Sequence, residues 1–211
     1  MRKVFGIVWV GFVLSAVAGA YEIRFENTGR GRTVDYVFKG NSRSNFAGDL
    51  TFTDLRTNLL FRTMCGDLDN VIQDGDQYNV VEKQSNTMGG GYQKGGTVFA
   101  KNIDAANTNN RAAALQIAVW AARYGTNLGT NSGGDFQLDS GWIANNTSIY
   151  NQAVSYFNSA NQGPANALFL EPSPVNGGQA QYAPVPEPVS LLAMGSGVAL
   201  LLRRRKFRPL V

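Results

Sequence analysis

Two residues of this chain carry side chains that could react with each other. Cys65 is the only cysteine among the 211 residues, and the chain has no histidine. Gln116 is an uncharged polar residue near the centre of an apolar stretch, residues 112–125. A buried carboxamide costs free energy unless it finds a partner. A thiolate held against it can displace ammonia and leave a neutral internal thioester, whose acyl group an amine or a hydroxyl can later take.

The same residues allow simpler interpretations. Cys65 cannot form an intrachain disulfide, so it could be a buried small hydrophobe, an intermolecular disulfide or a reactive thiol. Gln116 could donate a hydrogen bond to a backbone carbonyl and stay unreacted. The absence of histidine excludes Ser-His-Asp and Cys-His nucleophiles and the usual zinc sites. A hydrolase would therefore need another base, and none is spaced suggestively.

We expect no metal, no cofactor and no enzymatic turnover. Four acidic residues follow the cysteine, but their spacing does not match a calcium loop, so a solvated turn is expected there. They are Asp67, Asp69, Asp74 and Asp76.

A helix must present Gln116. Apolar residues recur at helical spacing through residues 112–125, and Gly125 stands where a left-handed C-terminal residue is favoured. Asn109 or Asn110 is the expected N-cap. Gln116 lies one turn before Trp120 and shares its face. Cys65 ends the expected strand 59–65, on the face that also holds Leu59, Phe61 and Thr63.

The remaining pattern predicts an α+β fold. Strands are expected at residues 21–26, 34–38, from 50 onward, 78–81, 97–100 and 167–170, separated by glycine-rich turns. A second helix follows residues 140–143 and should stop at Gly163. Strands grouped before helices favour an antiparallel, barrel-like sheet with a small helical part that carries Gln116. An N-terminal signal helix and a C-terminal membrane helix would complete the chain.

The N-terminus has the order of a secretory signal. Arg2 and Lys3 precede an apolar run, residues 4–17, and Ala18 and Ala20 supply small residues at the cleavage positions. We expect signal peptidase to cut after Ala20.

The C-terminus reads as a marginal membrane anchor. The apolar run 189–202 has 14 residues, fewer than the roughly 20 of a spanning helix. Arg203, Arg204 and Arg205 follow it and would stay on the cytoplasmic side. The expected organisation is a signal peptide over 1–20, one domain over 21–171, a linker over 172–184 and a sorting segment over 185–211.

The basic residues gather at the two ends. The chain has 19 basic and 15 acidic residues. Seven of the basic residues and one of the acidic residues lie in the two terminal segments. The middle therefore carries 12 basic against 14 acidic residues, a net charge of −2, with the basic ones scattered singly. This pattern does not indicate a nucleic-acid partner.

The tail resembles the PEP-CTERM sorting signal of Gram-negative bacteria that make exopolysaccharide. The matching residues are Pro186, Glu187 and Pro188, the glycine-containing apolar run and the arginine cluster. The resemblance implies an exosortase, a membrane cysteine protease, as processing partner. It implies a location in the inner membrane before processing and at the cell surface or in the extracellular matrix afterwards.

The middle resembles the bacterial thioester domain of surface adhesins. Met64-Cys65 and, later, Gln116-Ile117-Ala118-Val119-Trp120 carry the resemblance, although Met64 replaces an aromatic residue and Leu115 a Thr or Ser. The resemblance implies Cys65 as the thiol, Gln116 as the acyl donor and Trp120 as an aromatic cover. Phe61, on the cysteine's face of the strand, is expected to help shield the bond.

Two functions remain open from the sequence. The first is an exported adhesion protein that attaches covalently to an amine- or hydroxyl-bearing polysaccharide or protein of the envelope or matrix. The second is a structural component of the exopolysaccharide matrix that keeps an unreacted cysteine.

Overall fold

The computed structural model describes residues 19–174 and 177–185. The expected signal segment up to Ala18 and the sorting motif, Pro186 to Pro188 with Arg203 to Arg205, lie outside the described residues. Within them, no helix combines the length and apolar character needed to cross a membrane.

The fold is α+β, with an antiparallel sheet that closes on itself. Its main strands are β1 (Tyr21–Phe38), β2 (Asn41–Asp54), β3 (Leu59–Cys65), β4 (Gln77–Gln84), β6 (Leu168–Pro172) and β7 (Gln181–Ala183). The strand order is β2-β3-β7-β6-β4-β1, and β1 also pairs with β2, so these strands form a ring. The short β5 (Phe136–Leu138) adds to the far end of β1.

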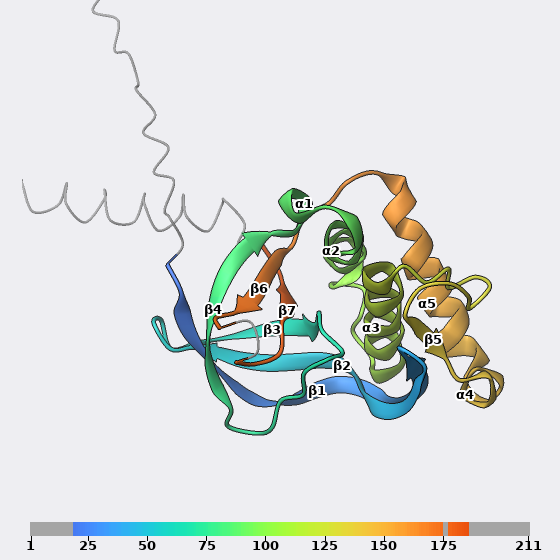
Figure 1. Ribbon diagram of the computed structural model, residues 1–211, viewed down its shortest axis with the longest axis horizontal. Helices are drawn as coiled ribbons and strands as arrows, with labels where there is room; N and C mark the ends of the chain where they lie inside the picture. The colour runs from blue at the N-terminus through green and yellow to red at the C-terminus, as the bar shows by residue number, and fades with distance from the viewer. Residues whose placement is uncertain (1–18, 175–176, 186–211) are drawn as a thin grey trace, which may run out of the picture.

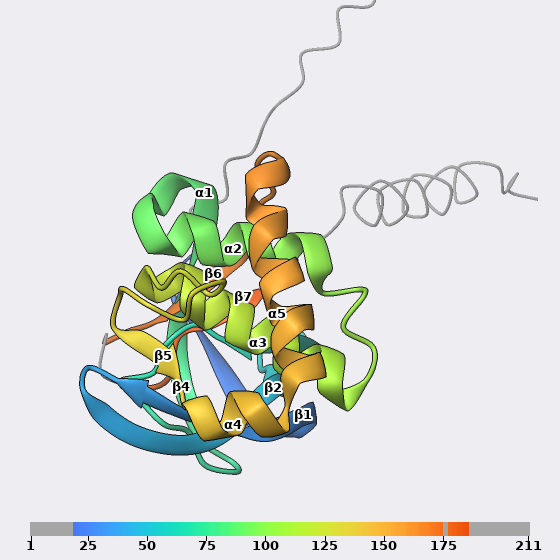
Figure 2. The same cartoon turned by 90° about the vertical axis from the view of Figure 1, so that its right-hand side faces the viewer.

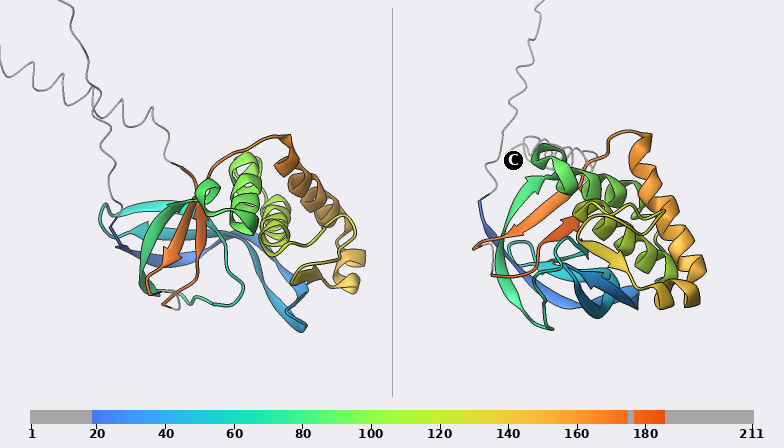
Figure 3. Two further views of the ribbon diagram at one scale, coloured as in Figure 1. Left: turned by 45° about the horizontal axis from the view of Figure 1, so that its top comes forward. Right: turned by 45° about the vertical axis from the view of Figure 1, so that its right-hand side comes forward.

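Helices cover one end of this barrel (Figure 1). They are α1 (Ser85–Met88), α2 (Gly90–Asn102), α3 (Asn109–Tyr124), α4 (Ser140–Asn145) and α5 (Thr147–Ser159), followed by the short η1 (Ala160–Gln162). Figure 2 shows α5 in front of α3, and the left view of Figure 3 separates the barrel from the helices. Helix α3 is thus enclosed between the barrel and its neighbours α2 and α5.

Helix α3 is buried on all sides. Every residue from Ala112 to Ala122 is buried, Gln116 included. Such all-round burial is typical of a central helix rather than an amphipathic surface helix. Gly125 ends α3 in the left-handed conformation, with φ 79°, as its position predicts. The N-cap differs from the expectation, because Thr108 rather than Asn109 or Asn110 accepts the N–H of Arg111.

The sequence-based expectation was wrong at two glycine-rich places. The expected strand 97–100 belongs instead to α2, whose glycines permit close packing: a Cβ at Gly96 would lie 2.1 Å from the hydroxyl oxygen of Ser85. The expected strands 21–26 and 34–38 are one strand, β1, with register shifts against β2. One of these shifts lies between Thr28 and Gly31, where β1 and β2 approach closely. A Cβ at Gly48 would lie 2.1 Å from the carbonyl oxygen of Arg30.

The expected linker, residues 172–184, contains a strand of the barrel. Strand β7 lies between β3 and β6, and Gln181 pairs with Cys65. All three residues of β7 are buried. Polar and proline-rich composition suggested a linker, but the strand fills the last gap in the ring. The expected second helix is α5, which η1 continues up to Gly163, and residues 140–143 belong to the short α4 that precedes it.

Candidate functional site

The structure places Cys65 and Gln116 side by side. Cys65 is the last residue of β3, and Gln116 lies in the second turn of α3, which packs on the barrel. The backbone N–H of Cys65 donates to Oε1 of Gln116 at 2.9 Å. Nε2 of Gln116 donates to the backbone carbonyl of Cys65 at 2.8 Å. One residue therefore holds both ends of the carboxamide.

The thiol of Cys65 is free and buried, with 5% of the residue exposed. Its sulfur donates a hydrogen bond to the backbone carbonyl of Asp67. Burial raises the pKa of the thiol to about 12, against smaller lowering effects from the Asp67 backbone and the Trp120 indole. The protonated thiol is thus the stable form at neutral pH, and both reacting groups are uncharged.

Trp120 lies beside Cys65 and Gln116, and its indole Nε1 has no hydrogen-bond partner among the described residues. Trp120 is 1% exposed and packs against both Tyr36 and Phe136, at centroid distances of 5.5 Å and 5.7 Å. Among the described residues, the buried Nε1 finds no hydrogen bond of ordinary geometry. It nevertheless lies near enough to the sulfur of Cys65 to lower the thiol's pKa. A buried donor without an acceptor is uncommon and points to a role at this site.

Cys65, Gln116 and Trp120 line one cavity of about 210 Å³. Phe25, Phe46 and Leu50 contribute apolar walls, while Thr28, Asn45, Asn70, Asp74 and Gln179 contribute polar groups. Val71, at the rim, is 71% exposed. The cavity thus connects a buried thiol and carboxamide with the surface through the loop between β3 and β4.

Phe61 is not part of this cavity. It stacks on Phe52, with ring centroids 6.1 Å apart, and lines a separate groove near the start of β3. Cys65 lies four positions further along the strand, or about 13 Å away. Phe61 is therefore too far from the sulfur of Cys65 to shield it, contrary to the expectation from the sequence.

The loop after Cys65 is held by groups that the sequence did not single out. The hydroxyl of Tyr124 accepts the N–H of Leu68 at 2.8 Å. Nε2 of Gln179 donates to the carbonyl of Asn70 at 2.8 Å. Gln181, fully buried on β7, accepts from Thr63 and donates to Gln179. The alternation of Gln179 and Gln181 with the apolar Ala180 and Tyr182 was the available sign of a strand.

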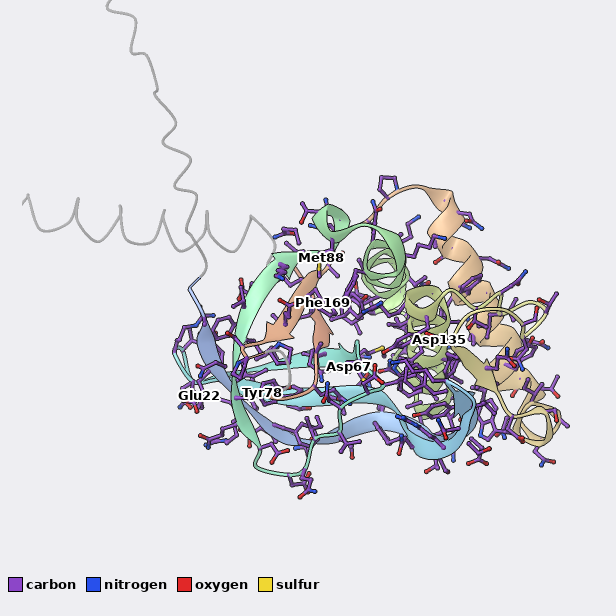
Figure 4. The ribbon with its side chains drawn as sticks, in the orientation of Figure 1. Glu22, Asp67, Tyr78, Met88, Asp135 and Phe169 are labelled. Atoms are coloured by element: carbon purple, nitrogen blue, oxygen red, sulfur yellow. The ribbon has the colours of Figure 1, made fainter. Side chains whose placement is uncertain are left out.

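Two acidic residues of this loop stabilise turns. Oδ1 of Asp67 accepts the N–H of Asp69 at 2.7 Å, and Oδ2 of Asp76 accepts the N–H of Gln73 at 2.7 Å. Asp67, labelled in Figure 4, lies where the barrel meets α3. Its backbone carbonyl, rather than its carboxylate, is the group that bonds the thiol.

Comparison with known proteins gives no further guidance. No protein-family description matches this chain, and no curated protein or solved structure matches it either.

Proposed function

We propose that Cys65 and Gln116 form an internal thioester in an exported protein, which uses it to attach covalently to an amine- or hydroxyl-bearing partner. The observation that carries the proposal is the pair of hydrogen bonds between the Gln116 carboxamide and the backbone of Cys65. These bonds fix the carboxamide against the residue that carries the thiol. Proximity of this kind removes much of the entropic cost of a reaction.

The first step exchanges one neutral group for another. The sulfur of Cys65 attacks Cδ of Gln116, the Cδ–Nε2 bond breaks, and the thiol proton leaves with the nitrogen as ammonia. Negative charge develops on Oε1 during the attack. The N–H of Cys65 already donates to that atom, so it is placed to stabilise the charge. The thioester is uncharged, which suits a buried site.

The second step transfers the acyl group. An amine or hydroxyl of the partner attacks Cδ, the Cδ–Sγ bond breaks, and the partner's proton passes to the sulfur. The partner is then joined to Gln116 by an amide or ester, and the thiol of Cys65 is free. The indole N–H of Trp120 is the donor available to stabilise the departing sulfur. Each molecule reacts once, so the protein is not an enzyme.

The cavity supports transfer to a small group on a larger partner. Its volume of about 210 Å³ admits a slender side chain or a sugar hydroxyl, while apolar walls limit access of water to the bond. Tyr21, the residue that follows the expected signal cleavage site, is the first residue of β1. We further propose that the sorting segment tethers this domain to the inner membrane until exosortase releases it.

A second function is favoured by one feature of the same site. The carboxamide satisfies both of its hydrogen-bonding ends without reacting, and burial keeps the thiol protonated. The domain would then be a non-covalent structural component of the exopolysaccharide matrix, with Cys65 and Gln116 tying β3 to α3.

Intact mass separates the two functions. The covalent proposal predicts that the exported protein is lighter than its sequence by one ammonia and gains one methylamine on treatment. Cys65→Ala is the matched control, because Gln116 bonds the backbone of residue 65 and keeps its partners. This variant should show neither change. An unmodified wild-type mass, with a thiol that titrates after denaturation, would support the structural role instead.

A further inference from the structure

An apolar groove lies at the other end of β3 from Cys65. It has a volume of about 350 Å³, and its walls include Leu59, Leu60 and Phe61 together with Leu168 and Leu170. Leu59 is 66% exposed and Leu60 67%. Among the described residues, the large hydrophobic side chains left exposed are these two, Val71 and Val185. Exposed apolar side chains that gather at one place mark an interaction surface.

The chain enters and leaves the domain at this groove. Tyr21, the first residue of β1, and Pro184, just after β7, both line it. Glu22, labelled in Figure 4, lies at the end of the barrel away from α3. The seven residues of β3 place Leu59 about 20 Å from Cys65. The groove and the thiol cavity therefore lie at opposite ends of one strand.

The length of chain beyond the domain restricts what can cover the groove. The sequence continues from Val185 to an apolar run that begins at Val189. Four residues of extended chain span at most about 14 Å. If residues 189–202 enter a bilayer, the surface of that bilayer must lie within this distance of Val185. Leu59 and Leu60 are then the exposed apolar side chains that face it.

We propose that the turn between β2 and β3 docks on the membrane surface before the tail is cut, with Leu59 and Leu60 inserted at the boundary of headgroups and acyl chains. This inference rests on the proposed membrane tether. The contact is apolar rather than electrostatic, because the charges around the groove are already paired. Arg56 pairs with Asp54 at 2.7 Å and with Glu82 at 3.6 Å. Docking therefore does not require anionic lipids.

Such docking orients the reactive site. With the β2–β3 turn on the bilayer, the end of β3 that carries Cys65 is held away from it. The cavity that holds the thiol is then presented to partners outside the membrane while the protein is still tethered.

A fluorescent probe next to the leucines tests this. The full chain, carrying Cys65→Ala and Thr57→Cys labelled with an environment-sensitive dye, is placed in phosphatidylcholine nanodiscs. Thr57 is exposed in the turn between β2 and β3. We expect blue-shifted emission that spin-labelled lipids quench. The same label at Ser148→Cys, exposed on α5, should not be quenched. Adding Leu59→Ser and Leu60→Ser should abolish the quenching at residue 57.

Each contrary result identifies what failed. A protein that stays on the disc with an unquenched label at residue 57 retains its tether and overturns the docking. A blue shift without quenching by lipids also overturns it, since the groove is then covered by protein. A chain that does not remain on the disc overturns the tether itself, and the docking with it. The mass experiment on Cys65 and Gln116 is unaffected by any of these results.

Discussion

Gln116 makes both side-chain hydrogen bonds to one residue, Cys65, which lies 51 positions away in the sequence. The bonded groups are the backbone N–H and carbonyl of Cys65, so the side chain of that residue takes no part in the contact. This arrangement separates the positioning of the two residues from their chemistry. A substitution of the cysteine side chain can therefore remove the thiol without removing the contact.

Methylamine should destabilise the wild-type domain if the thioester is present. A bond between residues 65 and 116 closes a loop of about 51 residues, and a crosslink of that length stabilises a fold by about 4 kcal/mol. Urea unfolding should show a loss of that order after methylamine opens the bond. Cys65→Ala should show no change on treatment. An equal response of the two proteins, or none in either, would contradict the crosslink.

Trp120→Phe should slow the opening of the thioester by about 10-fold to 100-fold. The substitution keeps an aromatic ring in the cavity but removes the indole N–H, whose hydrogen bond to a developing thiolate is worth about 1.5–3 kcal/mol. The rate of methylamine incorporation, followed by mass, measures the effect.

Trp142→Phe is the matched control for that substitution. Its indole N–H is also buried from much of the solvent, but it donates to the carbonyl of Thr33 at 3.2 Å, away from the sulfur. This variant should incorporate methylamine at the wild-type rate. Equal slowing in both variants would assign the effect to packing instead of the N–H of Trp120.

Alkaline pH should weaken the domain more when the thiol of Cys65 is free than when it is acylated or absent. Its pKa rises to about 12 in the fold, from about 8.5 in an unfolded chain. The stabilisation linked to this shift is complete below pH 8.5 and is lost as the pH rises towards 12. Between these values the free energy of unfolding should fall by up to about 1.4 kcal/mol per pH unit.

The buried tyrosines also titrate at high pH, so the effect of the thiol needs a difference measurement. Urea unfolding between pH 8.5 and 10 should show the extra slope in methylamine-opened protein relative to Cys65→Ala. Untreated wild-type protein, in which the sulfur is acylated, should follow the slope of Cys65→Ala. If untreated protein instead has the steeper slope, its thiol is free and the thioester is absent.

The domain should need its last strand to fold. A chain that ends at Glu171, the expected domain boundary, lacks β7 and leaves β3 and β6 with unpaired edges. A chain that extends to Val185 keeps the ring closed. We expect cooperative thermal unfolding for the longer chain and aggregation or broad unfolding for the shorter one, because open strand edges are sites of association. Cooperative unfolding of the shorter chain would refute this.

The sequence predicted the local elements of the site well. The bounds of β3 follow from alternation, and the core of α3 follows from helical spacing and the position of Gly125. It also singled out Gln116, because a carboxamide in an apolar helix requires a buried partner. These features depend on neighbouring residues and are therefore visible in one sequence.

The features that depend on tertiary packing were not predictable. Helix α2 is rich in glycine because its neighbours approach closely, and local preference alone suggests a turn there. Strand β7 is polar at Gln181 because that side chain bonds Thr63 and Gln179, and such composition resembles a linker. Phe61 shares a strand with Cys65, but its neighbours in the closed barrel belong to a different cavity.

Strand β7 has a mechanical consequence, because it is the last element of the described residues before the chain continues towards the tail. A partner joined to Gln116 would be attached through α3, while the tail would pull on Val185. Force between them would pass through the short β7, which pairs with β3 on one side and β6 on the other. Both neighbours share the load, so the three-residue strand cannot peel away from one edge without also leaving the other. The force that the attachment withstands would then be limited by the pairing of β7 with β3 and β6.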